Sequence, residues 1–104
     1  MGIQHYRTAQ QQAESAQQTE YRLLAELTRR LMAIDSVKTP EAIAAIHDNT
    51  IAWSTFAADL ALPDNPLPDA LKARLISLYI WVEKHSRAVL RHGAAVAPLI
   101  DVNK

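Results

Sequence analysis

Apolar residues recur at intervals of three and four along most of the chain, which is the period of amphipathic α-helices. The pattern predicts four main helices, over about residues 3–14, 16–34, 40–62 and 68–92, and a short C-terminal helix that starts near Pro98. The apolar run at residues 75–82 has no second run with which it can pair as a strand, and helix-favouring residues surround it. The predicted fold class is therefore all-α, a small helical bundle in a single domain over residues 1–104.

Local start and stop signals define the expected ends of these helices. Thr39-Pro40-Glu41 combines a capping residue, a proline suited to the first helical position and an acid that favours the positive end of the helix dipole. Ser15 and Gln18 have the spacing of a capping box, which marks the start of the second helix. Prolines at positions 63, 66 and 68 end the third helix and start the fourth, and Gly93 is suited to a left-handed cap after the fourth.

Each of the three longer helices has a stripe of residues that we expect to be buried. In the second helix the stripe consists of Tyr21, Leu24, Leu27, Leu31 and Ile34. In the third it consists of Ile43, Ile46, Thr50, Trp53, Ala57 and Leu60. In the fourth it consists of Leu71, Leu75, Leu78, Val82, His85 and Val89.

The fourth helix is apolar on nearly every side, since only Ser77 interrupts the run from Leu75 to Val82. A helix of this kind must be enclosed by other helices or by a partner. We expect a carboxylate introduced at Leu78 to unfold or dissociate the protein, because Leu78 lies in the middle of this run. The two tryptophans, Trp53 and Trp81, are too large for both to be fully buried in so small a bundle, so we expect one of them to be an exposed anchor for a partner.

Composition narrows the possible functions. The 11 basic residues balance the 11 acidic ones, which argues against non-specific nucleic-acid binding. The chain has no cysteine, the N-terminus has no apolar signal core, and no apolar run approaches the ~20 residues that span a bilayer. We therefore expect a cytoplasmic protein that does not associate with membranes.

Candidate catalytic or metal-binding residues are few. None of the four histidines pairs with another at a spacing of four, so no metal site is predicted. Asp59, Asp64 and Asp69 surround the proline-rich loop, where acids ordinarily cap helices or form turns. The expectation is a protein that is not an enzyme and has no catalytic, cofactor-binding or metal-binding residues.

A basic cluster lies near the end of the fourth helix, where cations complement the helix dipole. An RNA-phosphate patch and a contact with the acidic groove of a protein partner are the functional alternatives. The cluster consists of Lys84, His85, Arg87, Arg91 and His92.

Seven blocks, in the same order along the chain, resemble the FlaF family of bacterial flagellar biosynthesis regulators. They are Tyr6-x-x-Ala9, Glu20-Tyr21-Arg22-Leu23-Leu24, Thr28-Arg29-x-Leu31-Met32, Trp53-Ser54-x-Phe56-x-x-Asp59, Pro63-x-Asn65-x-Leu67-Pro68, Ile76-Ser77-Leu78-x-Ile80-Trp81-Val82-x-x-His85-Ser86 and Leu99-Ile100-x-Val102-Asn103. Members usually carry a further turn or two after the Val-Asn pair, whereas this chain stops at Lys104. We therefore expect the natural chain to continue.

The resemblance implies a cytoplasmic non-enzyme that is needed for flagellin production and acts after transcription. It also implies a partnership with flagellin itself and a functional link to the companion regulator FlbT, which acts on flagellin messenger RNA. No catalytic or cofactor residues come with the family.

Three hypotheses follow. The first is a flagellin-binding, chaperone-like regulator that holds a flagellin terminal segment as an extra helix in an apolar groove. The second is an RNA-binding translational regulator of flagellin messenger RNA, and the third is a structural homodimer that buries the fourth helix in its interface. The candidate partner-binding residues are Tyr21, Arg22, Trp53 and Trp81.

Overall fold

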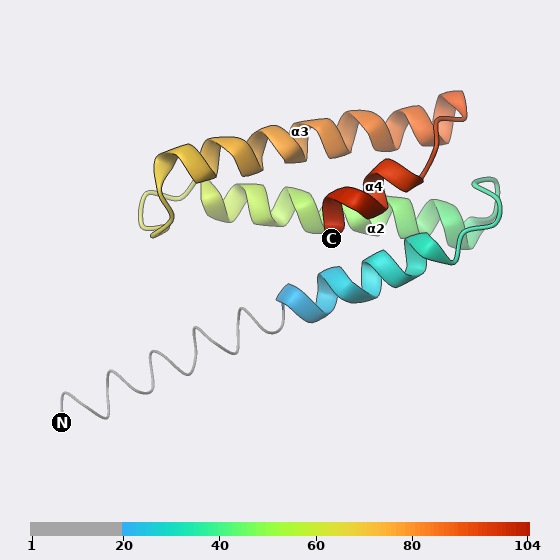
Figure 1. Cartoon of the computed structure of the whole chain (residues 1–104), viewed down its shortest axis with the longest axis horizontal. Helices are drawn as coiled ribbons and strands as arrows, with labels where there is room; N and C mark the ends of the chain where they lie inside the picture. Colours follow the sequence, from blue (N-terminus) through green and yellow to red (C-terminus); the bar gives the residue numbers. More distant parts are fainter. Residues whose placement is uncertain (1–19) are drawn as a thin grey trace.

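A computed structural model describes residues 20–104, and every regular element in this range is a helix (Figure 1). The first helix is described over residues 20–32 and is called helix 20–32 below. It is followed by α2 (Pro40–Leu60), α3 (Asp69–His92) and α4 (Ala97–Asn103). The all-α prediction is confirmed for this range, while the helix predicted at residues 3–14 and the Ser15–Gln18 capping box lie outside the described residues.

The predicted start and stop signals operate as expected. The Thr39 hydroxyl accepts a hydrogen bond of 3.1 Å from the backbone N–H of Ala42, and Pro40 occupies the first position of α2. Gly93 ends α3 in the left-handed conformation with φ 70°, where its missing side chain avoids the strain of a Cβ. Both predicted boundaries are confirmed because the caps depend only on neighbouring residues.

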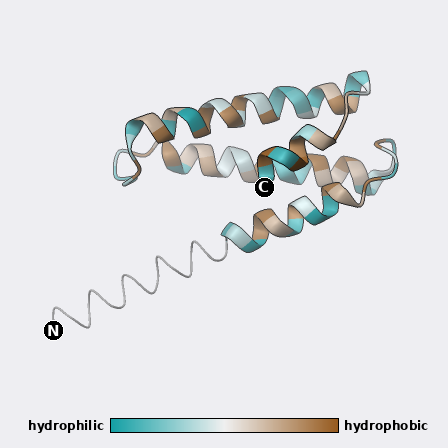
Figure 2. Cartoon of the chain, viewed as in Figure 1, coloured by the Kyte–Doolittle hydropathy of each residue, from teal (hydrophilic) through white to brown (hydrophobic). Residues whose placement is uncertain are grey.

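α2 and α3 run antiparallel, joined by the loop at residues 61–68, and α4 lies against them (Figure 1). Helix 20–32 packs at its C-terminal end, where Leu27 and Leu31 are buried, and its N-terminal end diverges from α2. Brown, hydrophobic positions appear on all these helices in Figure 2. The buried core draws on every helix and consists of Leu31, Ala45, Ile46, Trp53, Val82, Val89 and Leu99.

The predicted buried face of α3 was partly wrong. Val82 and Val89 are fully buried, but Leu71 is 40% exposed and Leu78 is 38% exposed. Ser86 is buried between the two valines, so the buried stripe is rotated from the expected one. Because α3 is apolar on several sides, its sequence cannot select the face on which α2 and α4 pack.

Two further positions of the predicted stripes are exposed. Tyr21 is 77% exposed because it lies on the diverging end of helix 20–32, and Ile43 is 45% exposed on the first turn of α2. No helix in the described range is long and apolar enough to cross a membrane.

Candidate partner-binding groove

A groove of about 500 Å³ opens where helix 20–32 diverges from α2. Its walls come from helix 20–32, the last two turns of α2, the loop at residues 61–68 and the first turns of α3. The surface is largely apolar and is formed chiefly by Leu24, Phe56, Ala57, Pro66, Leu67 and Leu75. We call this surface the apolar groove.

The loop at residues 61–68 forms one end of the apolar groove. Pro63 prevents α2 from continuing, and the chain turns back over its last turn. Asn65 holds this turn: its side-chain carbonyl accepts a 3.1 Å bond from the backbone N–H of Leu67, and its amide donates to an Asp59 carboxylate oxygen at 3.3 Å. These bonds bring Leu67, which remains 37% exposed, to the edge of the apolar groove.

Trp53 forms part of the groove lining but is only 7% exposed. Phe56 lies edge-on to its ring, with 6.3 Å between ring centroids. The indole N–H donates a 2.9 Å bond to the side-chain oxygen of Asn103 in α4, and the Asn103 amide donates a 2.8 Å bond to the side-chain oxygen of Asn49 in α2. Trp53 therefore joins α2 to α4 through a buried polar chain.

The other predicted anchor, Trp81, is 36% exposed on α3. Its ring stacks on His85 with centroids 4.8 Å apart, and the Nε2 of His85 lies 2.8 Å from the carbonyl oxygen of Ala95. Of the two tryptophans, Trp81 is thus the more exposed. It lies outside the apolar groove, in a shallow hollow on α3 beside Arg74 and Leu78.

The structure does not bring the four predicted candidates together. Of the four, Trp53 alone lines the apolar groove, and it is nearly buried there. Tyr21 and Arg22 are exposed on helix 20–32 outside the groove lining, and Trp81 lies on α3. Sequence reasoning missed Leu24, Phe56 and Leu67 as groove residues. They belong to three of the blocks that carry the FlaF resemblance, so the motifs held the signal, although their spacing could not show that they meet.

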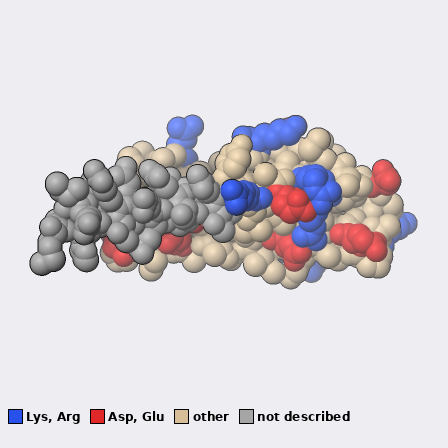
Figure 3. All heavy atoms as spheres, turned by 90° about the horizontal axis from the view of Figure 1, so that it is seen from below, with Lys and Arg blue, Asp and Glu red and all other residues tan. Residues whose placement is uncertain are grey.

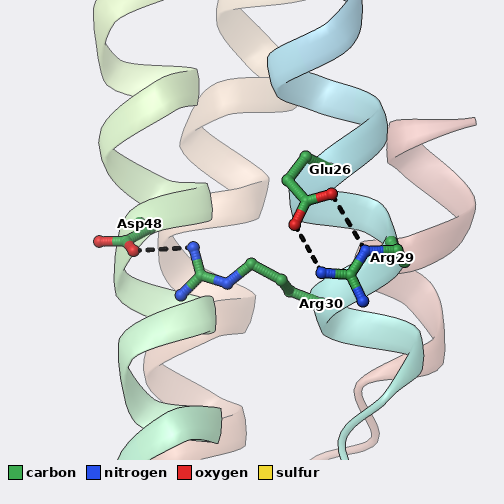
Figure 4. Close-up of polar contacts among 4 residues, drawn as sticks. All are labelled: Glu26, Arg29, Arg30 and Asp48. Atoms are coloured by element: carbon green, nitrogen blue, oxygen red, sulfur yellow. Dashed lines mark hydrogen bonds and ion pairs between the residues drawn. The ribbon is translucent and has the colours of Figure 1, made fainter.

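Two exposed ion pairs involve arginines of helix 20–32, and neither forms a binding or catalytic site. Arg29 pairs with Glu26 through both carboxylate oxygens, and Arg30 reaches Asp48 of α2 at 2.9 Å (Figure 4). The hydrogen bond from Arg29 holds the pKa of Glu26 below its ordinary value, with a smaller contribution from the charge of Arg29. Exposed ion pairs of this kind contribute little to the stability of the fold. Basic and acidic side chains are intermixed on the face of the protein drawn in Figure 3.

The described residues contain no group of three or more His, Cys, Asp or Glu side chains that could hold a metal ion. Over residues 2–104 the chain matches the sequence model of the family described as Flagellar protein FlaF. The chain belongs to the FlaF family. The match confirms the resemblance, and it makes this FlaF-family chain a flagellar protein. No curated protein and no solved structure matches it.

Proposed function

We propose that this FlaF-family chain binds flagellin as a chaperone-like partner and controls flagellin production or secretion after transcription. The observation that carries the proposal is the apolar groove, which leaves Leu24, Phe56 and Leu67 available to a helical segment of another protein. The role is one of binding without catalysis. An amphipathic helix recognises such a groove through side chains at spacings of three, four and seven.

The dimensions of the groove suit a short stretch of helix. Trp53 and Leu60 both line it, and seven residues of helix span about 10 Å. Two turns of a partner helix have the same length and present three or four side chains on one face. The volume of about 500 Å³ accommodates several such side chains.

If the flagellin segment is disordered when free, its complex with the groove would be reversible. Ordering the segment costs free energy, which lowers the affinity for a given contact area. A partner held in this way is protected from premature assembly and can still be released. The association should show a negative heat-capacity change, because apolar surface is buried.

The test is calorimetric titration of the protein with monomeric flagellin. Leu67→Asp should weaken binding at least tenfold, because it places a carboxylate at the apolar edge of the groove. Leu62→Asp is the matched control: Leu62 lies in the same loop and is 50% exposed, but does not line the groove. Leu24→Ala and Leu23→Ala form a second such pair on helix 20–32.

Two results would favour the other hypotheses. Absence of a complex with flagellin, together with concentration-dependent self-association that Trp81→Ala abolishes, would identify a homodimer built on α3. Steeply salt-dependent binding to flagellin leader RNA, lost on Arg87→Glu with Arg91→Glu, would identify an RNA-binding regulator.

A further inference from the structure

Most of the residues that line the apolar groove come from an acidic stretch of the sequence. Residues 39–68, which contain α2 and the loop at residues 61–68, include four acidic residues and no lysine or arginine. α3, in contrast, carries five basic and two acidic residues. The balanced net charge therefore conceals an uneven distribution of charge along the sequence.

Among residues 20–104, the only charged groups that line the apolar groove are carboxylates. Asp59 comes from the last turn of α2, and Glu20 comes from the opposite wall on helix 20–32. Neither forms an ion pair with a lysine or arginine among the described residues. The Asp59 carboxylate accepts one bond, from Asn65, and a carboxylate has lone pairs for several more.

The C-terminus of α2 adds to the negative potential at this end of the groove. A helix C-terminus carries a partial negative charge that basic residues ordinarily neutralise, and α2 has no basic residue in its last turn. The N-terminus of α3 brings a partial positive charge to the same loop, but its first residue is Asp69, which offsets that charge. Asp59, Glu20 and the C-terminus of α2 therefore all favour a cation at the rim, while the nearest basic residues in the sequence of α3, Lys72 and Arg74, do not line the groove.

We infer that the apolar groove selects a helix whose apolar stripe is flanked by lysine or arginine, with the cationic side chain lying against Asp59 and Glu20. This inference rests on the proposed function and names the chemistry of the flagellin segment bound. Apolar contacts with Phe56 and Leu67 hold the helix, and the cation fixes its direction and register in the groove. Electrostatic complementarity of this kind contributes mainly to specificity and to the association rate.

The first arm of the test removes the two carboxylates while preserving shape. Asp59→Asn retains an oxygen that can accept the Asn65 bond, and Glu20→Gln is nearly isosteric. Each should weaken flagellin binding about two- to fivefold, and the double variant should lose most of the salt dependence of the wild type. Glu41→Gln is the control, because Glu41 is exposed on the first turn of α2 at the opposite end of the same helix.

The second arm uses two synthetic amphipathic peptides with the same apolar stripe, one flanked by lysine and the other by glutamate. The wild-type protein should prefer the lysine-flanked peptide, and Asp59→Lys with Glu20→Lys should reverse the preference. Equal binding of the two peptides, or flagellin binding that depends on Leu67 but not on Asp59, Glu20 or salt, would overturn the inference and leave the proposed function standing. Absence of flagellin binding by the wild-type protein would overturn both.

Discussion

Removing the Asn103 side chain should destabilise the protein far more than its place near the chain end suggests. The buried indole N–H of Trp53 donates to the Asn103 oxygen at 2.9 Å, and the Asn103 amide donates to Asn49 at 2.8 Å. An indole N–H can only donate, so this bond determines which way the Asn103 amide points. Asn103→Ala leaves both Trp53 and Asn49 without their partner.

The expected loss of stability follows from the two buried groups that lose their hydrogen-bond partner, the Trp53 indole N–H and the Asn49 side-chain oxygen. A buried polar group without a partner costs about 1–3 kcal/mol. Asn49 is fully buried, and its Nδ2 already has no partner among the described residues, so losing the bond from Asn103 to its side-chain oxygen removes the one side-chain bond it makes there. α4 can detach to admit water, but this exposes Leu99 at a cost of about 1.5–3 kcal/mol. We therefore expect a loss of about 2–4 kcal/mol, a large fraction of the stability of a small domain.

Thermal melting followed by circular dichroism measures this loss. In a domain of this size each kcal/mol lowers the Tm by about 4–8 °C, so a fall of about 10–30 °C is expected. Asp101→Ala is the control, because Asp101 is exposed on the same helix and should change stability by less than about 0.5 kcal/mol. In a Trp53→Phe background the effect of Asn103→Ala should shrink by about 1 kcal/mol. A Tm within about 2 °C of the wild type, or full additivity with Trp53→Phe, would refute the buried polar chain.

Three further outcomes are expected. Val82→Asp should unfold the protein, because a fully buried unpaired carboxylate costs several kcal/mol. Leu78→Asp, which the sequence alone predicted to unfold the protein, should cost only about 1 kcal/mol in urea denaturation, because Leu78 is 38% exposed; equal losses would place Leu78 in the core. Thr39→Ala should lose about 1 kcal/mol and the hydrogen-exchange protection of the first turn of α2, since it removes the cap; unchanged protection would contradict this role. Because the pKa of Glu26 is lowered, its pair with Arg29 stabilises the fold at pH values above the ordinary pKa of a glutamate, and this stabilisation is lost as the pH falls through the lowered pKa. If an NMR titration showed that Arg29→Ala leaves the pKa of Glu26 unchanged, Arg29 would not be the cause of the shift.

The sequence by itself determined where α2 begins and where α3 ends, whereas helix 20–32 and α2 each end two residues before the predicted positions, 34 and 62. Thr39 and Pro40 start α2, and Gly93 stops α3, through interactions among immediate neighbours. Such caps and breaks require no other part of the fold, so they can be read from the chain alone. The same holds for the family, whose motifs lie in order along the sequence and match over residues 2–104.

The tertiary structure decided which apolar residues are buried. Leu78 and Val82 are both apolar and lie one turn apart, but only Val82 faces the core, because that is where α2 and α4 contact α3. Trp53 rather than Trp81 packs in the core, and Asn103, 50 residues further along the chain, satisfies its buried N–H. A pairing across that distance leaves no local pattern in the sequence.

The apolar groove also could not be predicted from the sequence. The chain itself specified a surplus of apolar residues and the uneven placement of acids and bases, both of which are properties of composition and order. Whether Leu24, Phe56 and Leu67 meet at one surface depended on the angle at which helix 20–32 leaves α2 and on the fold of the loop that Asn65 holds. That geometry results from packing between distant segments, which only the folded structure determines.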